Sequence, residues 1–126
     1  MNLEVSFSMV IDQIAEQGDG AELTGYFKSE NENIVYTLKS RRDRMFITNE
    51  KVILVDYKGL SEKNKEFLIL PFSKITSINL KTTGVMKSDS VLLFFIPVIG
   101  VVKVEFGKDI PIKKVFQYLS SMIGNA

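Results

Sequence analysis

The feature that most constrains the fold is a succession of short apolar runs between Ile34 and Gly107, separated by polar or glycine-containing turns. The runs are rich in β-branched and aromatic residues, which favour strands. About seven of them fit in this stretch, a spacing typical of an antiparallel sandwich or small barrel. The predicted strands cover 34–39, 44–48, 51–57, 66–71, a bend followed by a strand within 73–80, then 91–96 and 101–106. Asn49-Glu50 reads as a two-residue hairpin turn, with Asn49 at positive φ.

The C-terminal segment predicts one amphipathic helix. Apolar residues recur at i, i+3, i+4 and i+7 between Ile112 and Ile123, which is the spacing of one buried helix stripe. Asp109 suits the N-cap, Pro111 suits the first turn, and Gly124 suits the end of the helix. We expect the stripe to dock on the open end of the strand layers, so the fold class is mainly β with a C-terminal helix.

The first 33 residues allow two interpretations. Phe7, Val10, Ile11 and Ile14 have the spacing of one helix face. Apolar residues at positions 3, 5, 7 and 9 instead alternate as in a strand. We favour a helix over 8–17 and a second helical turn near 22–28. Residues 1–33 are then an N-terminal helical extension, and residues 34–126 form the domain.

The composition excludes several classes of chemistry. Cys and His are both absent, which removes disulfides, thiolate nucleophiles, His-based acid–base catalysis and most transition-metal sites. The carboxylates show no paired spacing typical of a shared site. We therefore expect no catalytic residues, no metal and no cofactor. Sixteen Lys+Arg against fifteen Asp+Glu give a formal charge of +1, so the net charge favours neither nucleic acid nor anionic membrane as a partner.

The segment 91–102 is the longest apolar run. As a helix it would extend about 18 Å, against roughly 30 Å for the hydrocarbon core of a bilayer. The N-terminal residues also lack the basic region of a signal peptide. We therefore expect a cytoplasmic protein.

The middle of the chain carries an ordered series of short motifs. Its members are Arg42-Asp43, Thr48-Asn49, Lys51, Asp56 and Gly59, then Pro71-Phe72, Ile75-Thr76 and Thr83-Gly84. The series, within residues 34–123, resembles the bacterial pleckstrin-homology-like (PH-like) family. The resemblance implies a seven-stranded antiparallel barrel or sandwich with a C-terminal helix. It also implies a non-catalytic bacterial protein that forms a homo-oligomer, as a ring with five-fold symmetry.

The sharpest polar feature is the basic segment that runs from position 39 to position 44. Its four cations are the candidate ligands for an anion: Lys39, Arg41, Arg42 and Arg44. Arginine offers forked donors that suit phosphate, and in lipid-binding PH domains basic residues at this connection bind inositol phosphates. Asp43 offsets part of the positive field, and the resemblance also allows Arg42-Asp43 to fix the turn. The segment is either an anionic lipid or phosphate site on a monomeric module, or a solvated structural turn.

Three predicted strands are apolar without alternation, at 52–55, 67–70 and 91–96. A strand with one solvent-facing side should alternate, so these strands need cover on both sides. The N-terminal segment could pack across the sheet, or an exposed apolar patch could meet a second copy of the chain. We favour the second. The candidate interface residues are Leu68, Leu70, Leu93, Phe95, Val98 and Ile99.

Val98 and Ile99 belong to the predicted hairpin tip at 97–100. Apolar residues at such a tip could contact a membrane surface, but the tip contains no Lys, Arg, Trp or Tyr to anchor it there. An oligomer contact is therefore the favoured interpretation. A protein or peptide laid along an open sheet edge is a third hypothesis.

Overall fold

The computed structural model describes residues 4–58, 63–82 and 90–124, so the predicted loop glycines Gly59 and Gly84 lie outside the described residues. Within these ranges the elements are β1 (Val5–Ile11), β2 (Gln13–Ile14), the 3-10 helix η1 (Ala21–Tyr26), β3 (Ile34–Lys39), β4 (Arg44–Thr48), β5 (Lys51–Tyr57), β6 (Lys65–Pro71), the 3-10 helix η2 (Phe72–Lys74), β7 (Ser77–Thr82), β8 (Ser90–Ile96), β9 (Gly100–Phe106) and α1 (Ile112–Gly124).

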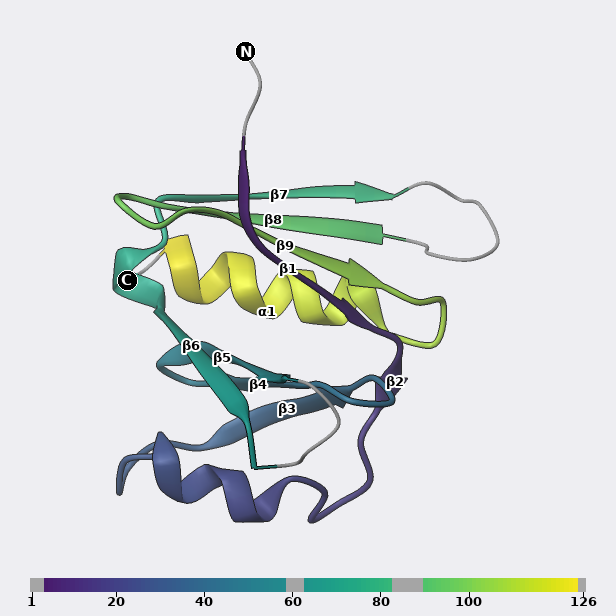
Figure 1. Cartoon of the computed structure of the whole chain (residues 1–126). Helices are drawn as coiled ribbons and strands as arrows, with labels where there is room; N and C mark the ends of the chain where they lie inside the picture. The colour runs from purple at the N-terminus through teal and green to yellow at the C-terminus, as the bar shows by residue number, and fades with distance from the viewer. Residues whose placement is uncertain (1–3, 59–62, 83–89, 125–126) are drawn as a thin grey trace.

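The strands form two sheets that stack as a sandwich (Figure 1). The first sheet has the order β1-β9-β8-β7, and the second has the order β2-β3-β4-β5-β6. Neighbouring strands pair antiparallel except β1, which joins β9 in parallel. The mainly β sandwich is therefore confirmed, although the sheets do not close into a barrel. The predicted strands at 34–39, 44–48 and 51–57 have the observed bounds.

The C-terminal helix is confirmed as α1, which lies between the two sheets in Figure 1. Val115 and Leu119 are fully buried in a core that both sheets share. Burying side chains of this size contributes roughly 1.5–3 kcal/mol each. The Tyr118 hydroxyl donates to the Thr48 carbonyl at 3.0 Å, which ties the helix to the end of β4.

The predicted N-terminal helix over 8–17 is wrong, because this segment forms β1 and β2. Met9 and Ile11 are buried, whereas Val10 is 50% exposed and Ile14 is 56% exposed. The four residues that defined the helical stripe therefore do not share one buried face, and the alternating pattern describes the segment correctly. A helix of this length is marginal alone, whereas as a strand the segment pairs with β9 between Val5 and Ile11.

The predicted helical turn near 22–28 appears as η1, which covers the outer side of the second sheet (Figure 1). Leu23 and Phe27 pack there against Phe46, Ile53 and Val55. This second apolar cluster explains why β5 is buried on both faces without the help of another chain. For β5, the cover comes from the N-terminal segment of the same chain. This was the alternative to cover by a second copy of the chain.

The β4–β5 hairpin is fixed by polar side chains rather than by a left-handed asparagine. Among the described residues, Val98 is the one non-glycine residue with a positive φ. The expectation of a positive φ at Asn49 is therefore wrong. Instead, the Thr48 hydroxyl accepts the backbone N–H groups of Glu50 and Lys51, both at 3.0 Å. The fully buried Glu32 adds an ion pair to Lys51 at 2.9 Å.

Candidate functional site

Two of the four candidate anion ligands are engaged by one carboxylate. Lys39 Nζ and Arg44 Nε each lie 2.9 Å from a different oxygen of Asp19. The hydrogen bond from Lys39, aided by the one from Arg44, lowers the pKa of Asp19 below its usual value. Asp19 stays ionised, so it offsets one of these two positive charges and holds both side chains in ion pairs.

Arg42, the third candidate anion ligand, binds the backbone at the end of β5. Arg42 donates to the Tyr57 carbonyl at 2.7 Å, and the Asp43 carboxylate accepts the Tyr57 N–H at 3.1 Å. Burial raises the pKa of Asp43. Arg42 and Asp43 therefore both hold the backbone of Tyr57, which fits the structural interpretation of this motif. Arg41 is exposed, and one exposed arginine is a weak basis for a phosphate site.

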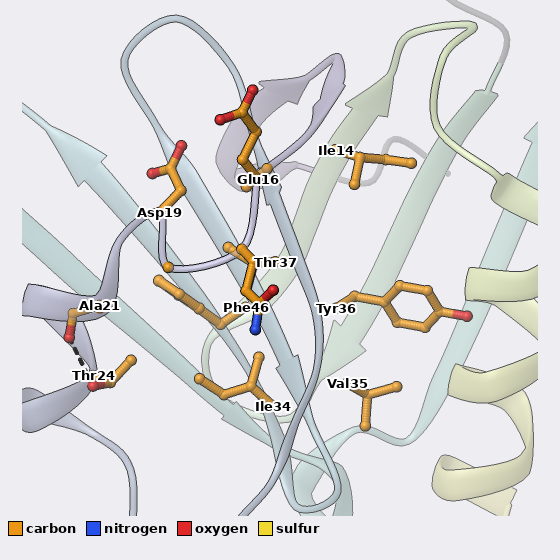
Figure 2. A pocket seen from close by; sticks show the side chains of 13 residues that line it. Ile14, Glu16, Asp19, Ala21, Thr24, Ile34, Val35, Tyr36, Thr37 and Phe46 are labelled. Atoms are coloured by element: carbon orange, nitrogen blue, oxygen red, sulfur yellow. Dashed lines mark hydrogen bonds between the residues drawn. The ribbon is translucent and has the colours of Figure 1, made fainter.

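A pocket of about 400 Å³ lies where the N-terminal segment leaves β3. The Ala15 N–H donates to the Thr37 carbonyl at 3.0 Å, and the chain then turns away toward η1. Figure 2 shows Glu16 and Asp19 at one end of this pocket. Asp19 is already paired with two cations, so Glu16 is the other carboxylate on the described lining of this pocket.

The edge of β3 beside this pocket is poorly suited to accept a peptide strand. Its register shifts between Ile34 and Tyr36, a bulge that leaves Val35 43% exposed. Bulges of this kind interrupt the regular row of donors and acceptors that an added strand needs. The Tyr36 ring packs against Tyr118 of α1 in an edge-on contact. The hypothesis of a peptide along this edge therefore gains no support here.

The predicted interface residues separate into two groups. Leu93 and Phe95 alternate along β8 with the buried Leu92 and Phe94, so they lie on the outer face of the first sheet, half-buried. No described element covers that face in Figure 1. We call it the β8 face, defined by Val91, Leu93 and Phe95 with their neighbours on β1, β7 and β9.

Leu68 and Leu70 require a correction. Leu70 is 1% exposed and belongs to the core, and Leu68 packs against that core, so neither faces outward as we expected. Their neighbour Ile69 is the exposed residue of this run, at 38%. In a uniformly apolar run, the sequence does not show which set of alternate residues faces the core. The neighbouring Pro71-Phe72 turn does not show it either.

The β8 face is most apolar at the end near the β8–β9 turn. Phe95 is flanked in register by Val101 and Ser77. Leu93 is flanked by Lys103 and Asn79, and Val91 by Glu105 and Lys81. The face is therefore apolar at the Phe95 end, has Lys103 and Asn79 on either side of Leu93 at its centre, and carries charges of both signs at its other margin.

The hairpin tip between β8 and β9 continues this apolar surface. Val98 is fully exposed and Ile99 is 43% exposed, which agrees with their predicted place at the surface. Val98 has a φ of 73°, and a β-branched residue in this left-handed region stores about 1–3 kcal/mol of strain.

A groove of about 400 Å³ lies beside the tip, and we call it the tip groove. Its walls include Ile69, Ser73, Lys74, Thr76, Pro97 and Ile99. Lys74 is the charged side chain among the described residues that line it. Sequence reasoning missed this groove, because it joins β6, η2 and the tip, which are distant in the sequence.

The described residues contain neither a membrane-spanning helix nor a cluster of metal-binding carboxylates. No helix there has the length and apolar character needed to cross a membrane. No group of three or more carboxylates there is arranged to hold a metal ion.

The comparisons with known proteins agree with the fold. Residues 8–123 match the family model of the bacterial PH domain. Uncharacterized protein YjqA of Bacillus subtilis (strain 168) is 33% identical over 67 residues, which are 53% of this chain and 54% of that protein. The chain thus spans about half the length of this curated relative.

Three solved structures that resemble the chain are also PH domain proteins. A DUF1696 family protein from Shewanella loihica PV-4 has a TM-score of 0.79 at 20% identity, over 88% of this chain and 96% of that chain. A PH domain from Shewanella amazonensis SB2B has a TM-score of 0.69 at 19% identity, over 88% and 90%. A bacterial protein from Exiguobacterium sibiricum 255-15 has a TM-score of 0.67 at 16% identity, over 92% and 62%. With its two-sheet sandwich, its C-terminal helix and a family match over nearly its whole length, the chain belongs to the bacterial PH domain family.

Proposed function

We propose that this bacterial PH domain is a non-catalytic assembly module that associates with copies of itself through the β8 face. The observation that carries the proposal is the difference between the two outer faces of the sandwich. The second sheet is covered by η1, with Leu23 and Phe27 packed on it. The first sheet presents Leu93 and Phe95 with no described element across them.

The charges of the β8 face support a second copy as its occupant. An interface between identical faces must be self-complementary. The margin of the face combines Glu105 with Lys81 and Lys103, so a rotated copy can set acidic side chains against basic ones. The formal charge of +1 also leaves little long-range repulsion between copies.

Substitution at the centre of the β8 face tests this function. Leu93→Lys introduces a charge at a half-buried outward position opposite Lys103, which costs a monomer a modest repulsion and costs a packed interface the burial of an unpaired charge. We expect light scattering after size exclusion to give an oligomer for the parent chain and a smaller mass for Leu93→Lys. Ile14→Lys is the matched control, because Ile14 is an exposed apolar residue away from this face. An unchanged mass for Leu93→Lys, or an equal loss for both variants, would refute the proposed interface.

A further inference from the structure

The pocket between the N-terminal segment, η1 and β3, which we call the β3 pocket, has one acidic end and one apolar end. Figure 2 shows Glu16 and Asp19 at one end, with Ile34 and Val35 at the opposite end. Ile14 and Val35 are 56% and 43% exposed. Two large apolar side chains that stay exposed on the folded chain therefore line this one pocket.

The walls of the β3 pocket are held in place without a ligand. Phe46 lines it and is buried in the apolar cluster under η1. Gly20, at a φ of 78°, lies so close to this ring that an added Cβ would be 2.9 Å from Phe46 Cζ. Asp19 is fixed at the acidic end by its ion pairs to Lys39 and Arg44. A pre-formed pocket of this kind binds a ligand with a small ordering cost.

The charges on the lining favour a cation. The described lining contains two carboxylates and no basic side chain. Lys39 and Arg44 bind both oxygens of Asp19 and are not part of the described lining. Among the described residues, no ion pair involves the Glu16 carboxylate. A cleft lined by charge of one sign attracts the opposite sign, so an anion is disfavoured here, and Glu16 is the carboxylate available to a cation.

We infer that the β3 pocket binds a small aliphatic ion with one ammonium group. The ammonium lies near Glu16, and the alkyl chain extends toward Ile34 and Val35. A second positive charge on the ligand is disfavoured, because it would enter the apolar end without a partner. The volume of about 400 Å³ is in the range of small-molecule pockets. The site lies beside the second sheet, so it is separate from the β8 face and does not depend on self-association.

The first test follows the backbone amide signals of the isotope-labelled parent chain by NMR during a titration with butylammonium chloride at neutral pH. We expect the signals of Thr37 and Phe46 to shift. Butylammonium should bind more tightly than the neutral butanol, and butyrate should bind least. Each methylene added from ethylammonium to butylammonium should tighten binding by up to about fourfold. Butanol that binds as tightly as butylammonium, or no shift at the pocket amides, would overturn the inference.

The second test removes the carboxylate. Glu16→Gln should weaken butylammonium binding about three- to fivefold and leave butanol binding unchanged. Glu22→Gln is the matched control, because Glu22 is an exposed carboxylate on η1 that is not on the described lining. Equal weakening by the two substitutions would mean that the cation senses only the general charge of the surface, and it would overturn the assignment to Glu16.

The third test probes the apolar end. Val35→Thr keeps the shape of the side chain and adds a hydroxyl, so it should reduce the gain from ethylammonium to butylammonium. Val10→Thr is the control, because Val10 is 50% exposed but lies on β1. An unchanged gain in Val35→Thr would overturn the placement of the alkyl chain.

Two further ligands define the chemistry of the occupant. Diaminobutane, which carries a second ammonium, should bind more weakly than butylammonium, and tighter binding would overturn the single-charge inference. N-acetyl-lysine methylamide presents the same alkylammonium on a peptide backbone. Tighter binding of this compound would assign the site to a lysine side chain of a protein, and tighter binding of butylammonium would assign it to a free amine. A monomeric parent chain that binds butylammonium would refute the proposed self-association and support this site.

Discussion

Replacing Lys51 by methionine should destabilise the domain strongly, because it leaves a buried carboxylate without its cation. Glu32 is fully buried, and its carboxylate lies 2.9 Å from Lys51 Nζ. It also accepts the Ser29 N–H at 3.0 Å and the Thr48 hydroxyl. Removing one partner of a buried ion pair costs about 3–5 kcal/mol. These hydrogen bonds remain, together with a longer one from the Ser29 hydroxyl at 3.4 Å, and place the expected loss near the lower end of that range.

The interaction energy between Glu32 and Lys51 can be measured by a double-mutant cycle, with unfolding in urea. A loss of about 3 kcal/mol moves the unfolding midpoint by about 2 M for an m-value of about 1.5 kcal/mol/M. Glu32→Gln combined with Lys51→Met removes both charges and keeps an acceptor for Thr48, so at least half of the loss should return. A loss under about 1 kcal/mol for Lys51→Met, or no recovery in the double variant, would refute the reasoning.

The same pair predicts a pH dependence with a definite sign. Burial alone would raise the pKa of Glu32, but the hydrogen bonds from Lys51 and Thr48 outweigh it and hold the pKa below the usual 4.5. A carboxyl with a lowered folded-state pKa contributes stability above its unfolded pKa, and this contribution is lost as the pH falls through the folded value. The unfolding free energy, measured from neutral to acidic pH, should therefore decrease once the pH is below 4.5. The decrease should be less steep in Glu32→Gln than in the parent chain.

Three other perturbations have definite expected outcomes. Asp19→Asn removes the carboxylate that pairs with Lys39 and Arg44, so it should lower the unfolding free energy by about 1–2 kcal/mol and increase retention on a phosphate resin; unchanged retention would argue against the neutralising role of Asp19. Leu23→Ala, beneath η1 on the second sheet, should cost about 2–4 kcal/mol in urea unfolding, and a loss under about 1 kcal/mol would mean that η1 is not a tight cover. Val98→Asn should raise the unfolding free energy of the dissociated chain by about 1 kcal/mol, and a loss of stability would contradict the strain assigned to φ at this position.

The sequence predicted the central strands and α1 well because their signals are local. Turn residues bound each run from Ile34 to Phe106, and the stripe from Ile112 to Ile123 has an unambiguous period. The N-terminal segment was ambiguous because Phe7 fits both a helical and an alternating pattern. The segment is a strand because it pairs with β9. This pairing joins residues that are about 95 positions apart, so no local pattern predicts it.

The candidate site was predicted less completely because its parts depend on long-range placement. Asp19 approaches Lys39 and Arg44 from 20 and 25 residues away, so its neutralising effect on the basic segment is not visible in a local motif. Leu70 was expected at an interface and is buried in the core, because an unbroken apolar run does not show which alternate residues face inward. Val98 and Ile99 were predicted at the surface because a short turn between two strands cannot be buried by either of them.

The absolute mass of the parent chain in solution, measured by light scattering over a dilution series, tests the assembly proposal most directly. The chain mass is 14.3 kDa. We expect a fixed multiple of this mass that dissociates only on strong dilution. A mass of one chain at every concentration would mean that the β8 face is left open to water, and it would contradict the proposed function.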